Sequence, residues 1–199
     1  MNKNRLEAFS DGVFAIVITL LVLDIHLPKT EAISDRELLA MIRSITPSIL
    51  TYVFTFLVVG IFWVAHHRIF NMVREVDSFL LFGNIFYLMT VALIPFPAAL
   101  LAKHPHLASS IIIYSSLLGA IGIQHLVFVD HIHRHSTLQH SIYSQKLYTQ
   151  ANRIGLVGPC CYATACISSL IHPYASFVFI LAPLVFYIGF ASKFYRKPI

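Results

Sequence analysis

One stretch near the start of the chain decides the fold class: residues 5–27 read RLEAFSDGVFAIVITLLVLDIHL. No charged residue stands between Asp11 and Asp24, and the whole stretch is long enough to cross the hydrocarbon core of a bilayer. The basic residues before it are typical of a signal peptide, but Asp11 interrupts the apolar run early and no small-residue cleavage site follows Leu23. We therefore expect a retained transmembrane helix from about Leu6 to Leu27.

The composition supports a membrane protein. Of 199 residues, 57% are hydrophobic and only 12% are charged, whereas a soluble domain has about 25% charged residues. The net charge of +5 does not indicate nucleic-acid binding, because the basic residues lie in short loops between apolar runs and form no patch. Cys160, Cys161 and Cys166 fall in one apolar run, which predicts buried free thiols and no disulfide framework.

Six apolar runs have bilayer-spanning length, and each must be helical because backbone groups in hydrocarbon need internal partners. The sequence therefore predicts one all-α domain over residues 1–199, with spans at about 6–27, 47–67, 79–102, 108–129, 154–171 and 174–194. The fifth span is the least regular, since it contains Gly155, Gly158 and Pro159. Prolines at 95, 97 and 183 predict kinks within or near the ends of their spans.

The distribution of Lys and Arg predicts the orientation. Ten of these residues fall at the N-terminus, after the second and fourth spans and at the C-terminus, and four fall on the other side. Because cytoplasmic loops carry the excess of Lys and Arg, we expect both termini in the cytoplasm of a multi-pass cell-membrane protein. Asn4, with Glu7 three residues later, predicts the start of the first helix.

A helical wheel separates two faces of the first helix. With Ile16 at the centre of one face, residues within about 60° carry one hydroxyl and no charge; they are Gly12, Thr19, Leu20, Leu23 and Leu27. Asp11 lies about 140° and Ser10 about 120° away, on the side of Phe14 and Ile18. The carboxylate of Asp11 is therefore expected to face other helices of the protein, where Ser, His, Asn or Trp can hydrogen-bond it.

These residues resemble a known family. Arg5 to Asp11 match the R-x-x-x-F-S-D signature of the transmembrane-protein-175 potassium channels, and the match continues to Leu23. Other positions similar to family landmarks are Tyr52, Trp63, His67, Asn84, Pro95 and Phe96. The six-span pattern covers the whole chain, but the detailed similarity is confined to about its first half.

The resemblance implies a potassium-permeable cation channel whose first helix lines the pore. It also implies a homotetramer, because a unit of six helices resembles the prokaryotic form of the family. By position, the pore constrictions would be Ile16, Thr19 and Leu23, with Leu20 and Leu27 nearby. The family lacks a carbonyl-lined filter loop, and this sequence has no T-V-G-Y-G run. The implied partners are other copies of the chain, the bilayer and monovalent cations, with potassium as the permeant ion and no cofactor.

Several residues allow more than one interpretation. We expect a structural polar network of Arg5, Phe9, Ser10, Asp11, Trp63, His67 and Asn84. Asp24, beside the outer end of the Ile16 face, is a candidate for attracting cations at the pore mouth, or for pairing with His26 or a neighbouring subunit. His131 and His135 are one helical turn apart and could bind zinc, although a solvated polar segment from His125 to His140 is the preferred interpretation.

Two other classes of protein remain open from the residues. An intramembrane metal or haem protein, or an enzyme, would use His66, His67 and His125, and stoichiometric iron or zinc would identify it. A secondary transporter would show broken helices at corresponding positions of its two halves, and only the fifth span is broken by its sequence. A channel without enzymatic activity is the preferred interpretation.

Overall fold

The computed structural model describes residues 2–27, 34–140 and 144–194, and the regular secondary structure in these ranges is helical apart from one isolated bridge between Val73 and Gln139. Within them, four helical segments are long and apolar enough to cross a membrane: Lys3–Asp24, Thr46–Asn71, Ser78–Lys103 and Ala108–Arg134. These four coincide with the first four predicted spans, and helices also occupy the positions of the last two.

The first span consists of helix α1 (Lys3–Leu20) and a tighter 3₁₀ turn, η1 (Leu21–Asp24). Its N-cap is Asn2, whose side-chain oxygen accepts a hydrogen bond from the Asn4 backbone N–H at 3.1 Å. The predicted start at Asn4 was therefore wrong by two residues. Glu7 instead pairs with Lys3 at 3.7 Å, which is the i, i+4 spacing of neighbours on a helix surface.

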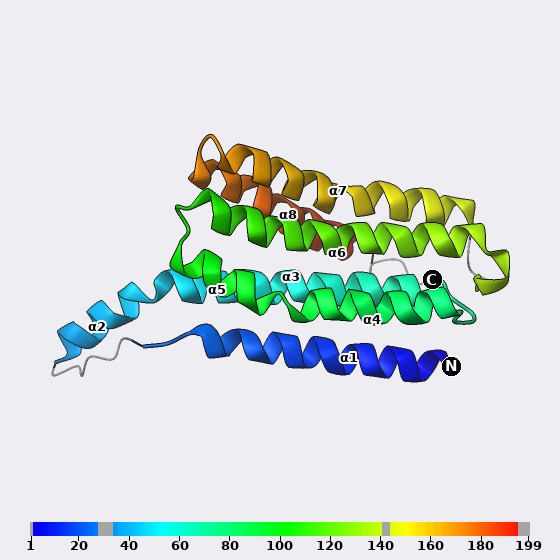
Figure 1. Cartoon of the computed structure of the whole chain (residues 1–199), viewed down its shortest axis with the longest axis horizontal. Coiled ribbons are helices and arrows are strands. Elements are labelled where there is room, and N and C mark those ends of the chain that lie inside the picture. Colours follow the sequence, from blue (N-terminus) through cyan, green and yellow to red (C-terminus); the bar gives the residue numbers. More distant parts are fainter. Residues whose placement is uncertain (1, 28–33, 141–143, 195–199) are drawn as a thin grey trace.

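A short amphipathic helix, α2 (Asp35–Ser44), precedes α3 (Thr46–Asn71), and the sequence analysis did not predict it. The sequence analysis placed the α2 residues in the connection between the first two spans. Ser34 caps α2, with its hydroxyl accepting from the Glu37 N–H. The α2 helix projects past the end of the helix bundle, and none of its residues is buried (Figure 1).

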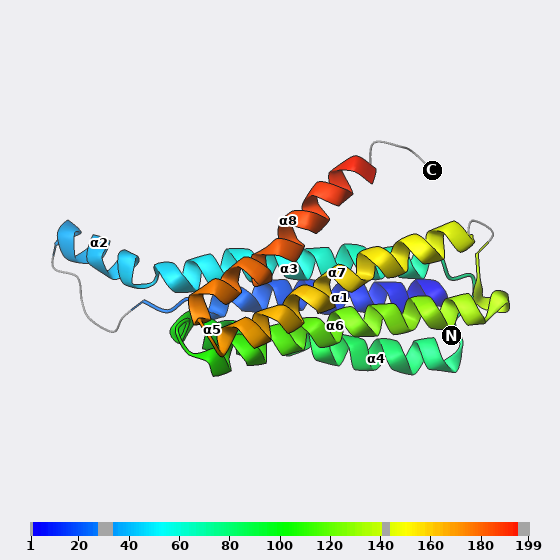
Figure 2. The same ribbon diagram turned by 90° about the horizontal axis from the view of Figure 1, so that it is seen from above.

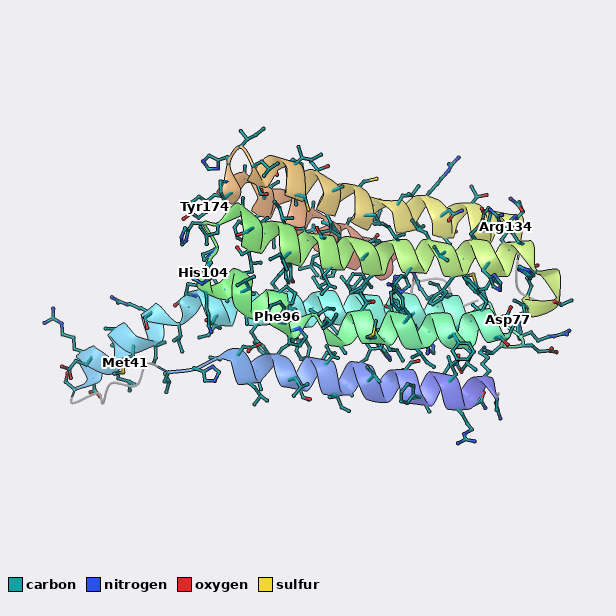
Figure 3. All side chains as sticks on the ribbon, in the orientation of Figure 1. Met41, Asp77, Phe96, His104, Arg134 and Tyr174 are labelled. Atoms are coloured by element: carbon teal, nitrogen blue, oxygen red, sulfur yellow. The ribbon has the colours of Figure 1, made fainter. Side chains whose placement is uncertain are left out.

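The third span is divided into α4 (Ser78–Ala92) and α5 (Pro95–Lys103). At the break the N–H groups of Leu93 and Ile94 bond to carbonyls only three residues back, on Thr90 and Val91. Pro95 has no N–H to continue the ladder, so the kink predicted from the prolines is present. The break leaves Phe96 on the outside of the bundle, 69% exposed (Figure 3).

The second half of the chain contains α6 (Ala108–Arg134), the 3₁₀ turn η2 (Ser136–Leu138), α7 (Gln145–Ser169), the turn η3 (Pro173–Ala175) and α8 (Ser176–Phe194). The α7 helix starts nine residues before the predicted span, because Ser144 caps a polar first turn. Closely packed α6 and α7 lie side by side: a Cβ on Gly122 would approach Pro159 Cγ to 2.9 Å. The glycine therefore permits the two backbones to approach.

The long helices run roughly parallel or antiparallel along one axis (Figure 1). One end of the bundle contains the N-terminus, the turn between α3 and α4 and the connection between α6 and α7, and Asp77 and Arg134 lie at this end (Figure 3). His104 and Tyr174 lie at the opposite end (Figure 3). The α8 helix packs against α7, and its second half leaves the bundle (Figure 2).

The cysteines are free, but they are less buried than predicted: Cys160 is exposed, and Cys161 and Cys166 are partly buried. The prediction placed the run in a core, whereas α7 lies at the edge of the bundle (Figure 1).

Candidate pore-lining face of the first helix

One face of α1 and η1 is left open by the rest of the chain. Ile16 is 59% exposed and Leu23 64%. Leu27 is 60% exposed but lies three residues beyond η1, because the backbone becomes extended at Ile25; the first span ends at Asp24, and the predicted end at Leu27 was wrong. Thr19 and Leu20 are exposed on the same face. In the 3₁₀ turn, residues three apart lie above one another, so Leu23 follows Leu20 along the helix. The face selected by the wheel is thus apolar, continuous and available to another surface.

The opposite face holds α1 against the bundle. Phe14 is 1% exposed and its ring lies 5.8 Å from the ring of His66 and 6.2 Å from that of Tyr87, measured between centroids. Ser10 is fully buried, and α1 packs directly on α3 and α4. The first helix therefore has one packed face and one unpartnered face.

A buried chain of hydrogen bonds joins α1, α4 and α3. The amide Nδ2 of Asn84 donates to Ser10 Oγ at 3.0 Å, and Ser10 Oγ donates to the Leu6 carbonyl at 2.9 Å. Asn84 Oδ1 lies 2.7 Å from His66 Nε2, which fixes this imidazole nitrogen as the donor because an amide oxygen only accepts. These buried polar groups fix the rotation of α1 relative to α4.

A second, more exposed hydrogen bond links α1 to α3. The indole Nε1–H of Trp63 donates to Asp11 Oδ1 at 2.7 Å. The carboxylate therefore faces α3, as the wheel indicates, and Trp63 is the partner. Asp11 itself is exposed at the surface of the single chain, whereas the sequence analysis expected it to be surrounded by protein.

The expected network is only partly assembled. His67 is exposed and stacked on Trp63 with ring centroids 6.2 Å apart, whereas His66 makes the bond to Asn84. The histidine bonded to Asn84 is therefore His66, and His67 points elsewhere because adjacent helical residues point about 100° apart. Arg5 and Phe9 are also exposed, and no hydrogen bond in the described ranges joins either side chain to this network.

A weak helical pattern in the sequence favours His66 over His67 as the buried histidine. Phe62, Ile69 and Phe70 lie three or four residues from it, on the same side of α3, and all three are buried. A histidine within such an apolar stripe is expected to face the interior.

The outer end of this face adjoins a small crevice. Asp24, which is partly buried, lines a cavity of about 20 Å³ together with Ser48, Thr51 and Tyr52 of α3 and Lys103 of α5. This volume suits a single water-sized particle. Asp24 therefore lies at the end of the open face, beside polar side chains of α3 and α5.

The histidines of α6 do not form a metal centre. His125 is buried, His131 contacts Asp77 at 2.8 Å and the ring of His133 stacks on Tyr148 at 3.7 Å. Among the residues that the structure describes, no group of three His, Cys, Asp or Glu side chains is placed to hold a metal ion. His125 was expected in a polar end segment and lies instead inside the bundle.

The fold is that of a polytopic helical membrane protein. Residues 5–95 match the family model described as endosomal/lysosomal potassium channel TMEM175. The crystal structure of a lysosomal potassium-selective channel TMEM175 homologue from Chamaesiphon minutus aligns with a TM-score of 0.79 and 32% identity, covering 94% of this chain and 96% of that chain. The chain belongs to the TMEM175 family.

Curated relatives agree with this assignment. A potassium channel of Streptomyces collinus is 44% identical over 130 residues, which are 62% of this chain and 61% of the relative. The human endosomal/lysosomal proton channel TMEM175 is 43% identical over 81 residues, 38% of this chain and 16% of the human protein. The aligned part of the chain spans about three fifths of the bacterial relative and about one sixth of the human one.

Proposed function

We propose that this protein is a potassium-permeable channel that works as a homotetramer, with α1 and η1 lining a central pore. The observation that carries the proposal is the unpartnered face from Ile16 to Leu27. A single copy of this helix encloses no pore, so function requires several copies around a symmetry axis. The bacterial relatives are named as potassium channels, which supports the choice of ion.

The chemistry of the face suits a gate. Four copies of Ile16 form one apolar ring and four copies of Leu23 form another. Such rings offer no oxygen to a dehydrating ion and close by contact or by expelling water. A narrow apolar ring penalises sodium more than potassium, because potassium holds its hydration shell more loosely.

Thr19 supplies the hydroxyl between the rings. Its Oγ1–H donates to the Ile16 carbonyl at 2.8 Å, so the proton is held by the backbone and the oxygen lone pairs remain available as acceptors. Four such oxygens would give a passing cation weak contacts without trapping it. Asp24, at the outer end of the face, would raise the local concentration of cations.

The polar contacts behind the face have a supporting role in this proposal. The bonds from Asn84 to Ser10 and from Trp63 to Asp11 hold α1 by its packed side, so that the open side keeps a fixed angle to the pore axis. We propose six membrane spans, with α7 and α8 as the fifth and sixth, and both termini in the cytoplasm, as the excess of Lys and Arg on that side indicates.

Reconstitution tests the proposal. Purified protein in liposomes should pass potassium down its gradient, faster than sodium, and native mass spectrometry should detect four chains. A monomer that carries no ion flux would refute both the assembly and the activity. If the protein passed ions and also carried stoichiometric bound metal, the metal-protein interpretation of the helix bundle would gain support.

A further inference from the structure

The two connections at the N-terminal end of the bundle interlock. The Arg74 N–H donates to the Leu138 carbonyl at 2.7 Å, and the His140 N–H donates to the Met72 carbonyl at 2.9 Å. These bonds join the turn between α3 and α4 to the segment that follows α6, around an isolated antiparallel bridge between Val73 and Gln139. Two segments more than sixty residues apart in sequence are thus held together at this end.

A side-chain pair lies beside this backbone contact. His131 Nε2 of α6 lies 2.8 Å from Asp77 Oδ2, and the other oxygen of the same carboxylate, Oδ1, accepts the Leu80 N–H at 2.8 Å. Asp77 is the N-cap of α4. One carboxylate therefore both starts α4 and ties it to the end of α6.

The surroundings of this pair are rich in ionisable groups. The ring of His131 contacts those of Phe79 and His135, with centroids 4.1 and 4.2 Å away. Partial burial acts to raise the pKa of Asp77, but the hydrogen bonds from Leu80 and His131 and the nearby charge of His131 and His135 outweigh it and lower the pKa.

Two further ion pairs lie near this end. Arg74 contacts Glu75 at 2.9 Å on the turn before α4, and Arg134 contacts Asp130 at 2.8 Å along α6. Tyr148 of α7 donates to Asp130 at 3.5 Å. Among the residues that the structure describes, Asp77 is the carboxylate that faces His131, and His135 is the neighbouring side chain that can carry a positive charge.

We propose that Asp77 and His131 form a proton-responsive clasp between the start of α4 and the end of α6. When the imidazole of His131 is neutral, the contact is a single hydrogen bond. When the imidazole gains a proton, the contact becomes an ion pair with a carboxylate that stays ionised, and charge-assisted hydrogen bonds are about twice as strong as neutral ones. Imidazole groups change charge in the range where cellular pH varies, so acidification at this end strengthens the clasp.

The clasp has a direct route to the first helix. The α4 helix starts at Asp77, and two turns later Asn84 donates to Ser10 on the packed face of α1. A firmer start of α4 therefore restrains the helix that holds α1. This last step, from the clasp to ion flux, rests on the proposed channel function, whereas the clasp itself does not.

A double-mutant cycle tests the clasp. Asp77→Asn keeps a side chain that caps helices and removes the charge, while His131→Gln removes the imidazole ring. Wild-type protein in detergent should show amide exchange at the start of α4 about threefold slower, after correction for intrinsic rates, at about pH 5.5 than at about pH 8. Each single variant should lose this difference, and the double variant should lose no more.

His133→Gln is the matched control, because His133 is two residues away on the same helix and stacks on Tyr148 rather than Asp77. It should keep the wild-type pH response. Additive effects of the two clasp variants, or a pH response that survives in both, would overturn the clasp. In liposomes, both clasp variants should lose the same part of the pH dependence of flux. Absence of flux in wild-type protein would count against the channel proposal, and the exchange measurement would still decide the clasp.

Discussion

Asn84 lies at the centre of the buried hydrogen-bond chain, with Ser10 on one side and His66 on the other. Asn84→Ala leaves the His66 Nε2–H without its acceptor and removes the hydrogen bond that Ser10 Oγ accepts, although Ser10 keeps its own bond to the Leu6 carbonyl. A buried polar group that is left unsatisfied costs about 1–3 kcal/mol. We expect a loss of about 3 kcal/mol in unfolding free energy, measured by denaturant titration in detergent. Ser10→Ala, which leaves one Asn84 donor unpaired, should cost less.

A half-buried asparagine supplies the control for Asn84. Asn152 lies on α7 and makes no side-chain hydrogen bond within the described ranges, so Asn152→Ala should change stability little. If Asn84→Ala and Asn152→Ala lowered the unfolding free energy equally, the hydrogen-bond chain through Asn84 would not be what holds α1.

At the residue level, the sequence predicted more of the open face than of the polar contacts. The exposed positions Ile16, Thr19 and Leu20 follow from helical geometry alone, because charge and periodicity agree, whereas Leu27 lies beyond the helix end at Asp24. The choice between His66 and His67 required knowledge of which side of α3 faces α4. That side is set by packing between helices, and the α3 helix is apolar on all sides, so a single-helix pattern carries a weak signal.

The hydroxyl of Tyr187 repairs the α7 helix near Pro159. It accepts the Gly158 N–H at 3.1 Å and donates to the Ile154 carbonyl at 3.0 Å, so it replaces the bond that would join these two backbone groups within the helix. Tyr187→Phe should therefore loosen the contact between α7 and α8 and cost about 1–2 kcal/mol.

The thermal unfolding midpoint measures this loss. Tyr174→Phe is the control, because Tyr174 is 61% exposed and its hydroxyl makes no hydrogen bond in the described ranges. A Tyr187→Phe protein as stable as the control would mean that α7 tolerates the unpaired groups.

Asp77 gives the start of α4 an acid sensitivity. Its pKa is lowered in the folded protein from the ordinary value of 3.8, so its stabilising contribution is complete above about pH 4 and is lost as pH falls through the lower folded value. Asp77→Asn should flatten the stability profile in this acidic range, measured as unfolding free energy against pH. An unchanged acid limb would contradict the assignment.

Element boundaries were predicted where composition changes sharply and missed where it does not. The break between α4 and α5 follows from Pro95. The α2 helix was missed because its amphipathic pattern is short and adjoins a long span, and the early start of α7 was missed because its first turns are polar. Length and hydropathy detect helices that cross the lipid. The α2 helix and the first turns of α7 can be detected only from their capping residues and local periodicity.

The whole molecule has an orientation that thiol labelling tests. Cysteines 160, 161 and 166 are first replaced, and one cysteine is introduced at Ser109, exposed at the start of α6, or at Gln145, exposed at the start of α7. Because ten Lys and Arg lie on the side of Gln145, Ser109→Cys should react with an impermeant reagent on intact cells. Gln145→Cys should react only after lysis, and the reverse pattern would invert the proposed topology.

The assembly is the part of the account that one chain's sequence predicts least directly. Hydropathy predicts the membrane spans, and the Lys and Arg counts predict which side of the membrane each loop lies on. Neither predicts what covers the open face, because that surface would be supplied by a second copy of the chain. Replacing Ile16 by Asn addresses that face without disturbing the packed side. Ile18, partly buried and packed against the core, provides the control, since Ile18→Asn should instead reduce folding and expression.

Reversal potential in reconstituted bilayers under opposed potassium and sodium gradients is the most direct measurement of the central claim. A polar ring stays wet and replaces part of a sodium hydration shell. Ile16→Asn should therefore raise conduction and move the reversal potential toward equal permeability of the two ions. If Ile16→Asn leaves both the current and the reversal potential unchanged, the open face of α1 does not line the pore.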